Sequence, residues 1–394
     1  MVVITLLVEV DYFLKRDLQY MKIRERYVAT VLHQDVDRVP FFPGRGRKST
    51  IENWYKQGLP EGEEWFGYLT KILGIETEWL YSEINPGINF KMIPEFEEKV
   101  LERTERTLVV QDWKGNICEI SDEFDVSYLR NPIDFVTRKW IKCPVEGWED
   151  WEQMKTRYNP DDPVRFPEDF KERCSFLSNQ ERVVSIAFSG LFNQLREWMG
   201  FEGLCIAFLE SPDLIRDMID FWCEYVSAML NKSLRLLKPD YVHISEDMAY
   251  KLKSMISPKM TREFLLPSWR QWGEIIHSSG CPIFDIDSDG YVGELIPIWI
   301  EAGFNINDPV EIAAGNDLYE YKQKFGNKMA YLGGVDKREI AKGKDAIKTE
   351  LERLKPIIKS SGFIPSCDHG IPADVSWPNM VEYAKQLAKA TGWL

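Results

Sequence analysis

From about residue 183 to the C-terminus, short β-branched runs alternate with amphipathic helical patterns. This alternation is typical of consecutive β–α units, which build a parallel sheet covered by helices. About six such units fit into this part of the 394-residue chain, which favours a closed (β/α)₈ barrel over an open doubly wound sheet. No glycine-rich phosphate-binding motif accompanies the strands, so a nucleotide-binding sheet is not indicated.

The boundaries of these units follow from local signals. Ser followed by Pro predicts helix starts at 212 and 258, because Pro suits the first helical position. Glycines at 303 and 362 predict helix ends. The predicted strands are 183–188, 241–245, 282–287, 304–307, 328–334 and 363–367. The predicted helices are 212–236, 258–280, 291–302, 343–361 and 376–391.

The N-terminal half is less regular. Residues 22–34 place apolar side chains on one helical face, and TLVVQD at 107–112 predicts a strand within an irregular stretch from 41 to 180. The first ten residues are apolar but too few to span a bilayer, and no basic segment precedes them, so a secretory signal is not expected. We expect 1–20 to be an extension and 21–394 to be one barrel domain with N-terminal additions.

Composition narrows the classes of partner. The formal net charge of −14 leaves no general basic surface for nucleic acid or an anionic membrane. The seven cysteines are scattered and odd in number, which indicates reduced thiols in a cytoplasmic protein. We therefore expect a small-molecule substrate, with no nucleic-acid and no membrane partner.

Carboxylates follow the predicted strands at nearly every exit. Active sites of β–α barrels lie at the carboxyl ends of the strands, so these side chains are expected to converge on one mouth. Polar loops and Asp helix caps would give a similar pattern, so each residue keeps a structural alternative. The strand-end groups are Glu246-Asp247, Asp285, Asp287, Asp289, Asp308 with Glu311, Asp336 with Lys337, and Asp368-His369.

His369 is the most informative single residue. It follows the last predicted strand, where a histidine can act as a general acid or a metal ligand, or can simply hold a loop through a carbonyl. Asp287 and Asp289 flank one turn, and such a pair suits either a divalent ion or acid–base work. Cys367 is the alternative metal ligand, as a thiolate.

Several ordered segments resemble the uroporphyrinogen decarboxylase superfamily. They include SEDMAYKLKSMISPKM, FDIDSDGYVGELIPIWIEAGFNIN, LGGVDKREIAKGKDAI and FIPSCDHGIPADVSWPNMVEYAKQL, together with RERYVATVLHQDVDRVPFFP near the N-terminus. The resemblance covers roughly 21–394 and implies a (β/α)₈ barrel with a deep polar mouth. It also implies one of two chemistries: decarboxylation of uroporphyrinogen without a cofactor, or zinc-assisted methyl transfer involving a corrinoid protein or a thiol.

True decarboxylases of this family carry an arginine-rich N-terminal segment that grips substrate carboxylates. The matching region here reads FFPGRGRKSTIENWY, in which Arg45 and Arg47 remain but the rest of the pattern is missing. The family's pyrrole-binding aspartate has no clear counterpart either. Both departures weigh against decarboxylation of uroporphyrinogen or a related polycarboxylate, although His369 matches that family's C-terminal histidine.

The methyltransferase branch is similar to this chain in the GGVDK segment. Its members typically carry His-x-Cys after the strand that PIFDID occupies here, and a later Cys near the last strand. This sequence has Asp287-Ser288-Asp289 and His369 or Cys367 at those places, so the resemblance implies a site richer in oxygen and nitrogen ligands, for a harder ion or for zinc. Methyl transfer between a small molecule and a corrinoid protein or thiol is the leading hypothesis; decarboxylation and non-catalytic binding of a small molecule are the alternatives.

The candidate residues are assigned as follows. The catalytic candidates are His369, Asp289, Asp287 and Glu246. The substrate-binding candidates are Arg45, Arg47, Asp247, Asp336 and Asn193. The metal-ligand candidates are Asp287, Asp289, His369 and Cys367. A corrinoid protein is the expected partner of a methyltransferase, a decarboxylase needs no cofactor, and a homodimer is compatible with either.

Overall fold

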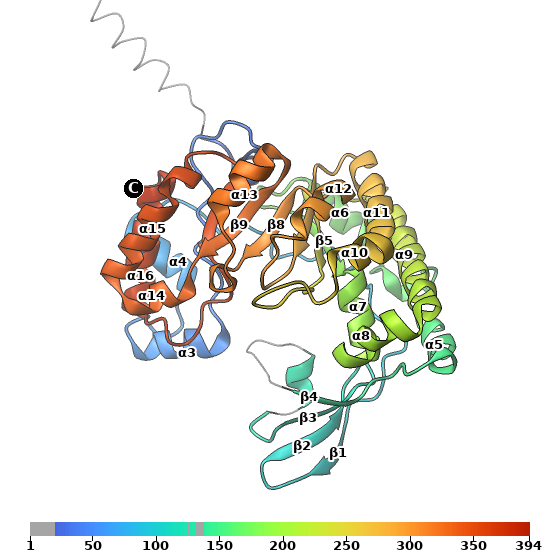
Figure 1. Cartoon of the computed structure of the whole chain (residues 1–394). Coiled ribbons are helices and arrows are strands. Elements are labelled where there is room, and N and C mark those ends of the chain that lie inside the picture. Colours follow the sequence, from blue (N-terminus) through green and yellow to red (C-terminus); the bar gives the residue numbers. More distant parts are fainter. Residues whose placement is uncertain (1–19, 125, 131–137) are drawn as a thin grey trace, which may run out of the picture.

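A six-stranded parallel sheet forms the centre of the computed structural model, which describes residues 20–124, 126–130 and 138–394. The strands lie side by side in chain order, and a helical connection follows each one, so the sheet consists of consecutive β–α units (Figure 1). They are β5 (Ser185–Ser189), β6 (Tyr241–Ser245), β7 (Ile283–Asp287), β8 (Ile306–Val310), β9 (Ala330–Val335) and β10 (Phe363–Cys367).

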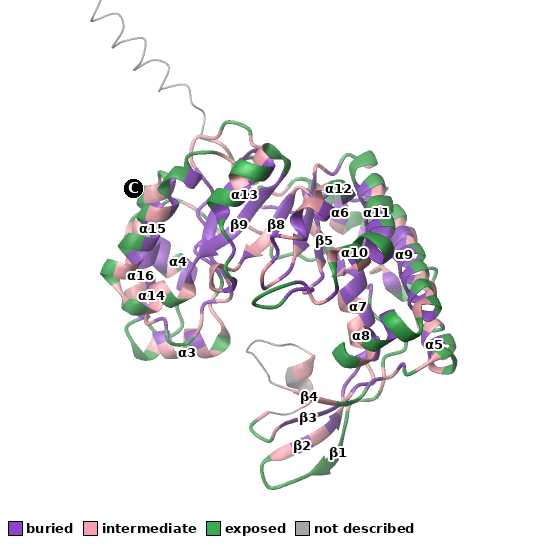
Figure 2. Cartoon of the chain, in the orientation of Figure 1, coloured by how far each residue is buried: buried purple, intermediate pink, exposed green. Residues whose placement is uncertain are grey.

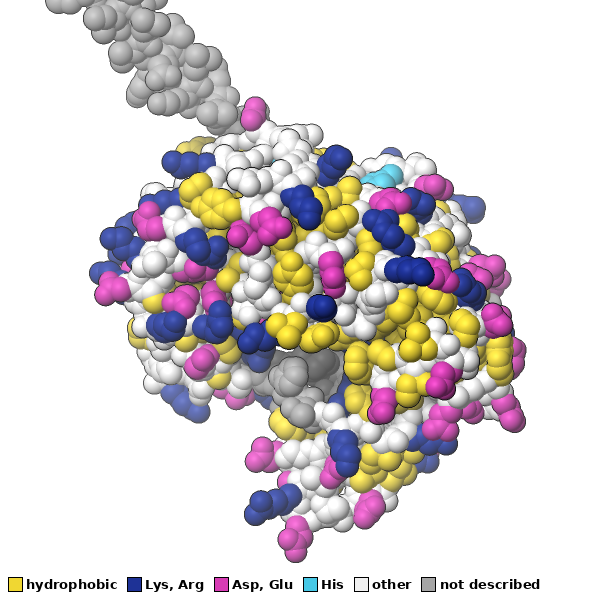
Figure 3. Space-filling view, viewed as in Figure 1, with side chains coloured by type: hydrophobic (Ala, Val, Ile, Leu, Met, Phe, Trp, Pro, Cys, Tyr) yellow, Lys and Arg dark blue, Asp and Glu magenta, His cyan; other side chains and the backbone are white. Residues whose placement is uncertain are grey.

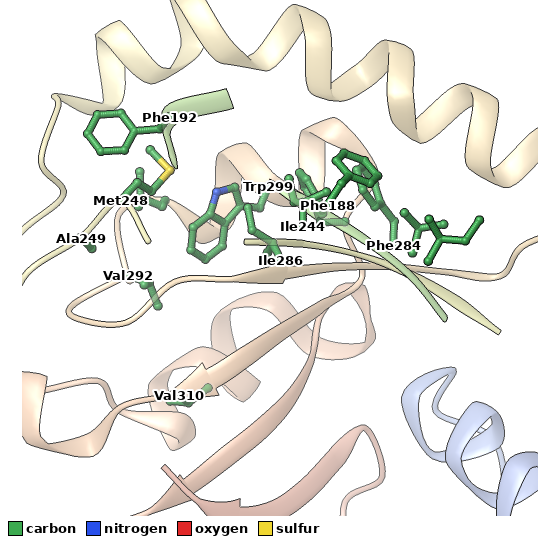
Figure 4. Packing of buried hydrophobic residues seen from close by; sticks show 14 of the residues in the cluster. Phe188, Phe192, Ile244, Met248, Ala249, Phe284, Ile286, Val292, Trp299 and Val310 are labelled. Carbon is green, nitrogen blue, oxygen red and sulfur yellow. The ribbon is translucent and has the colours of Figure 1, made fainter. Parts of the chain in front are cut away.

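Helices cover the outer face of this sheet, and that face is apolar because the helices bury it. Phe188, Ile244, Phe284 and Ile286 lie between the strands and a covering helix (Figure 4). The connecting helices are α7 (Leu191–Met199), α8 (Phe201–Glu210), α9 (Pro212–Leu234), α10 (Pro258–Met260), α11 (Leu266–Ser278), α12 (Ile296–Ala302), α13 (Leu318–Phe325), α14 (Lys337–Lys342), α15 (Lys344–Ile358) and α16 (Trp377–Thr391). In Figure 2 buried residues line the strands and the inward sides of these helices, and exposed residues lie outside.

The inner face of the sheet changes character along each strand. Its amino-terminal end is apolar: Val183, Ile283 and Ile306 pack in one cluster with Tyr27 and Val31 of α2 (Ile23–Val31). Since side chains alternate between faces, the residues two and four positions further along the strands face the same side. In β7 these are Asp285 and Asp287. The inner face is therefore apolar at the amino-terminal ends of the strands and polar toward their carboxyl ends.

Two extended N-terminal segments lie along the edges of the six strands. Gly46 forms a parallel bridge with Ile371, just beyond β10, and the amide N–H of Cys367 donates to the carbonyl of Pro43. At the opposite edge Tyr81 forms a parallel bridge with Val183, just ahead of β5. The helices α3 (Lys48–Lys56) and α4 (Trp65–Leu73) connect these two segments.

An antiparallel sheet projects from this body (Figure 1). Its strands are β1 (Lys99–Arg103), β2 (Thr107–Gln111), β3 (Ile117–Ser121) and β4 (Lys139–Lys142), and it has a small core of its own around Leu108, Val110, Cys118 and Ile120. The helices α5 (Trp148–Lys155) and α6 (Phe170–Ser178) lead back to β5. The sequence indicated only one strand here, at 107–112; β3 alternates between buried and half-buried residues as β2 does, whereas β1 is exposed throughout.

The predicted parallel strands are confirmed, and β6 and β10 match their predicted bounds. The helix predicted at 291–302 begins instead at Ile296, because Val292 donates its amide to the side chain of Asn316 and holds the preceding turn. The predicted extension at 1–20 falls outside the described residues except for its last residue. Over the described part of the chain, no helix combines the length and apolar character that crossing a membrane requires. On the face in Figure 3, basic and acidic side chains are intermixed.

Candidate functional site

A polar pocket of about 510 Å³ opens at the carboxyl ends of the strands. This is the end at which parallel α/β folds place their ligands. Its lining comes from the inner faces of the parallel strands, from the loops that follow them and from the N-terminal edge segments. The lining residues are Phe42, Gly44, Arg45, Tyr81, Ser185, Ala187, Tyr241, His243, Asp287, Asp289, Asp308, Pro309, Leu332, Ser366, Cys367, His369 and Gly370.

The register of β6, β7 and β8 brings four polar groups together. His243 lies opposite Asp285, and Asp287 lies opposite Asp308. The His243 Nδ1 and Asp285 Oδ2 atoms are 2.7 Å apart, so the ring donates a hydrogen bond to a carboxylate that is almost fully buried. Ser245 donates to Asp287 Oδ2 at 2.7 Å. We call His243, Asp285, Asp287 and Asp308 the strand cluster.

Burial and mutual repulsion shift the proton affinities of the strand cluster. Burial, followed by the charges of Asp285 and Asp287, raises the pKa of Asp308 to about 8. Burial raises the pKa of Asp287 to about 6. Burial lowers the pKa of His243, but the carboxylates, with Asp285 first, outweigh it and raise that pKa to about 9. Near neutral pH the cluster therefore holds protons beside an open pocket, and it can donate one there.

A second histidine–aspartate pair comes from the loops. The His369 Nε2 and Asp289 Oδ2 atoms are 3.0 Å apart, and this hydrogen bond, opposed by burial, raises the pKa of His369. Gly370 donates its amide N–H to Nδ1 at 2.7 Å, and an Arg47 guanidinium nitrogen lies 3.4 Å from the same atom. With Nδ1 accepting, the neutral ring carries its proton on Nε2, where Asp289 accepts it.

Arg45 contributes a positive charge to the lining. Its guanidinium lies over the ring of Tyr81, 5.3 Å from the centroid, and the side chain is exposed. Within the described residues it makes no ion pair. Burial raises the pKa of Tyr81 well above its usual value, so the phenol stays neutral beside the cation. Arg45 is thus available to bind an anionic group.

Glu246 does not line the pocket. Its side chain is fully buried and accepts hydrogen bonds from the backbone amides of Leu191, Phe192 and Asn193 and from the indole of Trp269. These amides are the unpaired donors of the first turn of α7, so the carboxylate caps this helix from the next strand. Burial raises its pKa to about 7, against four hydrogen bonds that lower it.

The other substrate-binding candidates also have protein partners. Asp247 forms an ion pair with Arg196 at 2.7 Å, and Asn193 accepts a hydrogen bond from the same arginine. Asp336 caps α14 and pairs with Arg338 at 2.6 Å, which holds its pKa below the usual value. Of the sequence-derived candidates, the pocket lining includes Arg45, Asp287, Asp289, Cys367 and His369, and Arg47 lies in contact with His369.

The four metal-ligand candidates are not gathered around one point. Asp289 and His369 bind each other, whereas Asp287 is bound by Ser245. Burial raises the pKa of the Cys367 thiol to about 12, which disfavours the thiolate that a metal needs. Among residues 20–124, 126–130 and 138–394, no group of three or more His, Cys, Asp or Glu side chains is placed to hold a metal ion. In this arrangement the donors do not fit a zinc site.

His243 is the residue that sequence reasoning missed. It lies inside a strand and not in a loop after one, so it is not among the strand-end groups, but its side chain is 24% exposed and faces the pocket. Tyr81 and Tyr241 were missed as well. The signal lay in the alternation of β6, in which the polar residues His243 and Ser245 occupy every second position of an otherwise buried strand.

Comparisons with known proteins address the fold. No protein-family model matches the sequence, and no curated protein matches it. A B12-independent methionine synthase from Shewanella sp. W3-18-1 aligns with 56% of this chain and 65% of its own at 12% identity, with a TM-score of 0.38. A methyltransferase from Methanosarcina mazei aligns with 94% of this chain and 98% of its own at 13% identity, with a TM-score of 0.58. The chain therefore shares the overall fold of the Methanosarcina mazei enzyme.

Proposed function

We propose that this chain is a methyltransferase of the uroporphyrinogen decarboxylase-like superfamily, which moves a methyl group between a small molecule and a corrinoid protein or thiol. The observation that carries the proposal is the strand cluster, a set of proton-holding groups at the floor of an open pocket. The fold shared with the Methanosarcina mazei methyltransferase supports it.

The chemistry that we assign to the strand cluster is proton donation. When a methyl group passes to a nucleophile, the bond between carbon and the substrate's oxygen, nitrogen or sulfur breaks. The electron pair of that bond stays on the leaving atom, which must then take a proton if it is to leave readily. Asp308, whose raised pKa keeps it protonated near neutral pH, would supply this proton, and His243 with Asp285 would pass a proton taken up from solvent to Asp308.

We further propose that the six strands belong to a closed eight-stranded barrel. The segments around Gly46 and Tyr81 would supply the first two strands, since each bridges one edge of the sheet in parallel. The apolar cluster beneath the pocket supports closure, because Phe42 and Leu80 join it beside residues of β7, β8 and β10. Closure would place Arg45 and the strand cluster around one mouth.

A corrinoid protein would dock over the mouth and accept or deliver the methyl group. Zinc, when bound, would polarise the atom to which the methyl group is attached. Since the described ligand candidates do not fit an ion as they stand, no step is assigned to zinc.

Decarboxylation is the second candidate, and one observation favours it. Arg45, which has no ion-pair partner among the described residues, presents its guanidinium to the pocket, as recognition of a substrate carboxylate requires. A proton donor such as Asp308 would also suit this reaction, because the carbanion left after loss of carbon dioxide must be protonated.

The two candidates can be separated in one experiment. The purified chain is incubated under anaerobic conditions with free cob(I)alamin and a panel of methyl ethers, methylamines and methyl thioethers, and methylcobalamin is followed by its absorbance. Methyl transfer that Asp308→Asn abolishes, and that Asp345→Asn at an exposed site leaves intact, supports the proposal. Turnover of uroporphyrinogen that depends on Arg45, without any methyl transfer, would replace it with decarboxylation.

A further inference from the structure

A second cavity, of about 350 Å³, adjoins the polar pocket. Its lining combines polar groups with more aromatic side chains than the polar pocket has. This lining is contributed by the segment before the projecting sheet, by the turn between β2 and β3, by β5 and by the helices α7 and α9. The aromatic residues in its lining are Phe90, Trp113, Tyr158, Phe188, Trp198 and Trp222. We call this space the aromatic cavity.

The two cavities meet at Ala187. This residue lines both, and it lies opposite His243 in the β5–β6 register. β5 is the last strand at one edge of the six, and Ala187 in its middle is exposed. The inner-face residues on either side of it, Ser185 and Ser189, are also small, so nothing on this strand separates the two spaces. Ser189 lines the aromatic cavity and Ser185 lines the polar pocket, so Ala187 lies at the border between the aromatic cavity and the pocket that holds the strand cluster.

Charges at the rim of the aromatic cavity indicate what kind of molecule fits. Lys114 is neutralised by an ion pair with Glu197. Lys91 is exposed, lies 4.9 Å from the centroid of the Trp113 ring, and makes no ion pair within the described residues. The side chains of Asn85, Asn89 and Gln194 complete a polar rim. A ligand with a flat apolar ring system would pack against the aromatic side chains, and an anionic substituent on it would form an ion pair with Lys91.

We propose that the aromatic cavity is a second subsite, which holds the aromatic, anionic body of a substrate whose methyl-bearing end crosses Ala187 to the strand cluster. This inference rests on the proposed methyl transfer for the role of the second end, but not for binding. It narrows the substrate to an aromatic carboxylate or a comparable aryl anion with a methylated substituent remote from the charge. Its length must span both cavities, which together have the size of typical small-molecule sites.

The test uses 6-methoxy-2-naphthoate and 2-naphthoate as probes, with binding to the full chain followed by fluorescence and by calorimetry. Both probes offer a carboxylate to Lys91, but only the first carries a methoxy group at the far end of the rings, which we expect to lie at Ala187. Ala187→Leu puts a larger side chain at the border between the two cavities. We therefore expect it to weaken the binding of 6-methoxy-2-naphthoate by about tenfold and to change the binding of 2-naphthoate by less than about twofold. Ala187→Ser, which keeps a small side chain there, is the matched control.

A second variant tests the charge. Lys91→Gln is expected to weaken the binding of both naphthoates by only about threefold, because an exposed ion pair contributes little. The binding of neutral 2-naphthalenemethanol should not change, since it forms no ion pair with Lys91. If Ala187→Leu does not fold, the Lys91→Gln measurement still tests whether the aromatic cavity binds an aromatic anion. The inference is overturned if neither naphthoate binds, if Ala187→Leu weakens both equally, or if Lys91→Gln affects the neutral probe as much as the acids.

The failure of this inference is distinguishable from failure of the proposed function. Binding is measured without a methyl acceptor, so it reports on the subsite alone. Tight binding of 6-methoxy-2-naphthoate without methyl transfer to cob(I)alamin would support the subsite and contradict the proposed methyl transfer. Methyl transfer from small methyl donors without binding of either naphthoate would support the proposed function and contradict the subsite.

Discussion

The two histidine–aspartate pairs of the pocket differ in how the fold holds them. His243 and Asp285 lie on adjacent strands and face each other through the sheet register, and the aspartate side chain is 3% exposed. His369 and Asp289 come from loops, and their side chains are 32% and 38% exposed. A strand pair is positioned by the ladder of backbone hydrogen bonds, whereas a loop pair depends on local contacts such as the amide of Gly370. The strand pair is thus suited to chemistry, and the loop pair to adjustment around a ligand.

The strongest test of this comparison is Asp285→Asn. The change removes the partner that raises the pKa of His243, so that pKa is expected to fall from about 9, and proton return to Asp308 fails. Turnover in the methyl-transfer assay should drop by about 100-fold or more, as is usual for loss of an acid–base group. The ring is titrated by NMR alongside the assay. If the pKa of His243 falls but turnover does not change, the pair of His243 and Asp285 takes no part in the reaction.

Glu246→Gln sharpens the comparison, since Glu246 also follows β6 but faces helix α7. The amide would point a donor at backbone N–H groups that already lack other partners, so we expect a loss of about 2 kcal/mol in the free energy of unfolding. Urea denaturation measures this loss. Asp247→Asn, in the more exposed ion pair with Arg196, is the control and should cost less. Equal losses for the two variants would contradict the capping role.

Asp289→Asn breaks the loop pair. The change leaves His369 bound through Gly370 and Arg47, so we expect turnover to fall by only about tenfold, equivalent to about 1.4 kcal/mol. The same kinetic assay compares it directly with Asp285→Asn. A larger loss for Asp289→Asn than for Asp285→Asn would reverse the assignment of the two pairs, and metal content measured on both proteins would show whether the loop pair holds an ion.

The smallest expected effect is a pH dependence of stability. Asp287 and Asp308 have pKa values of about 6 and about 8 in the folded protein, both above the value of about 4 in an unfolded chain. The folded state therefore binds these protons more tightly, so their stabilising contribution is complete below about pH 4 and is lost as pH rises through 6 and 8. The raised pKa of His243 acts in the same direction.

The melting temperature should thus be lower at pH 9 than at pH 6, by roughly 4 °C. Calorimetry on wild type and on Asp308→Asn measures the difference, which should shrink in the variant. A melting temperature that rises between pH 6 and pH 9 in the wild type would contradict the proton-holding character of the strand cluster.

The sequence by itself determined the order of β–α units, the bounds of strands such as β6 and β10, and the polar strand ends. These features depend on neighbours along the chain: side-chain alternation, Ser-Pro helix starts and glycine helix ends are local signals. The same local signals drew attention to Asp287, Asp289 and His369, because polar residues in loops after strands stand out in a sequence. All three line the pocket.

Only the tertiary structure decided which of these groups share a space. Glu246 and Asp287 look alike as strand-end carboxylates, yet one caps α7 and the other faces the pocket, because each direction depends on the elements packed beside it. The pairing of His243 with Asp285 arises from the register between strands that lie 42 residues apart in the chain. That register is set by the packing of whole faces against helices, which no short stretch of sequence encodes.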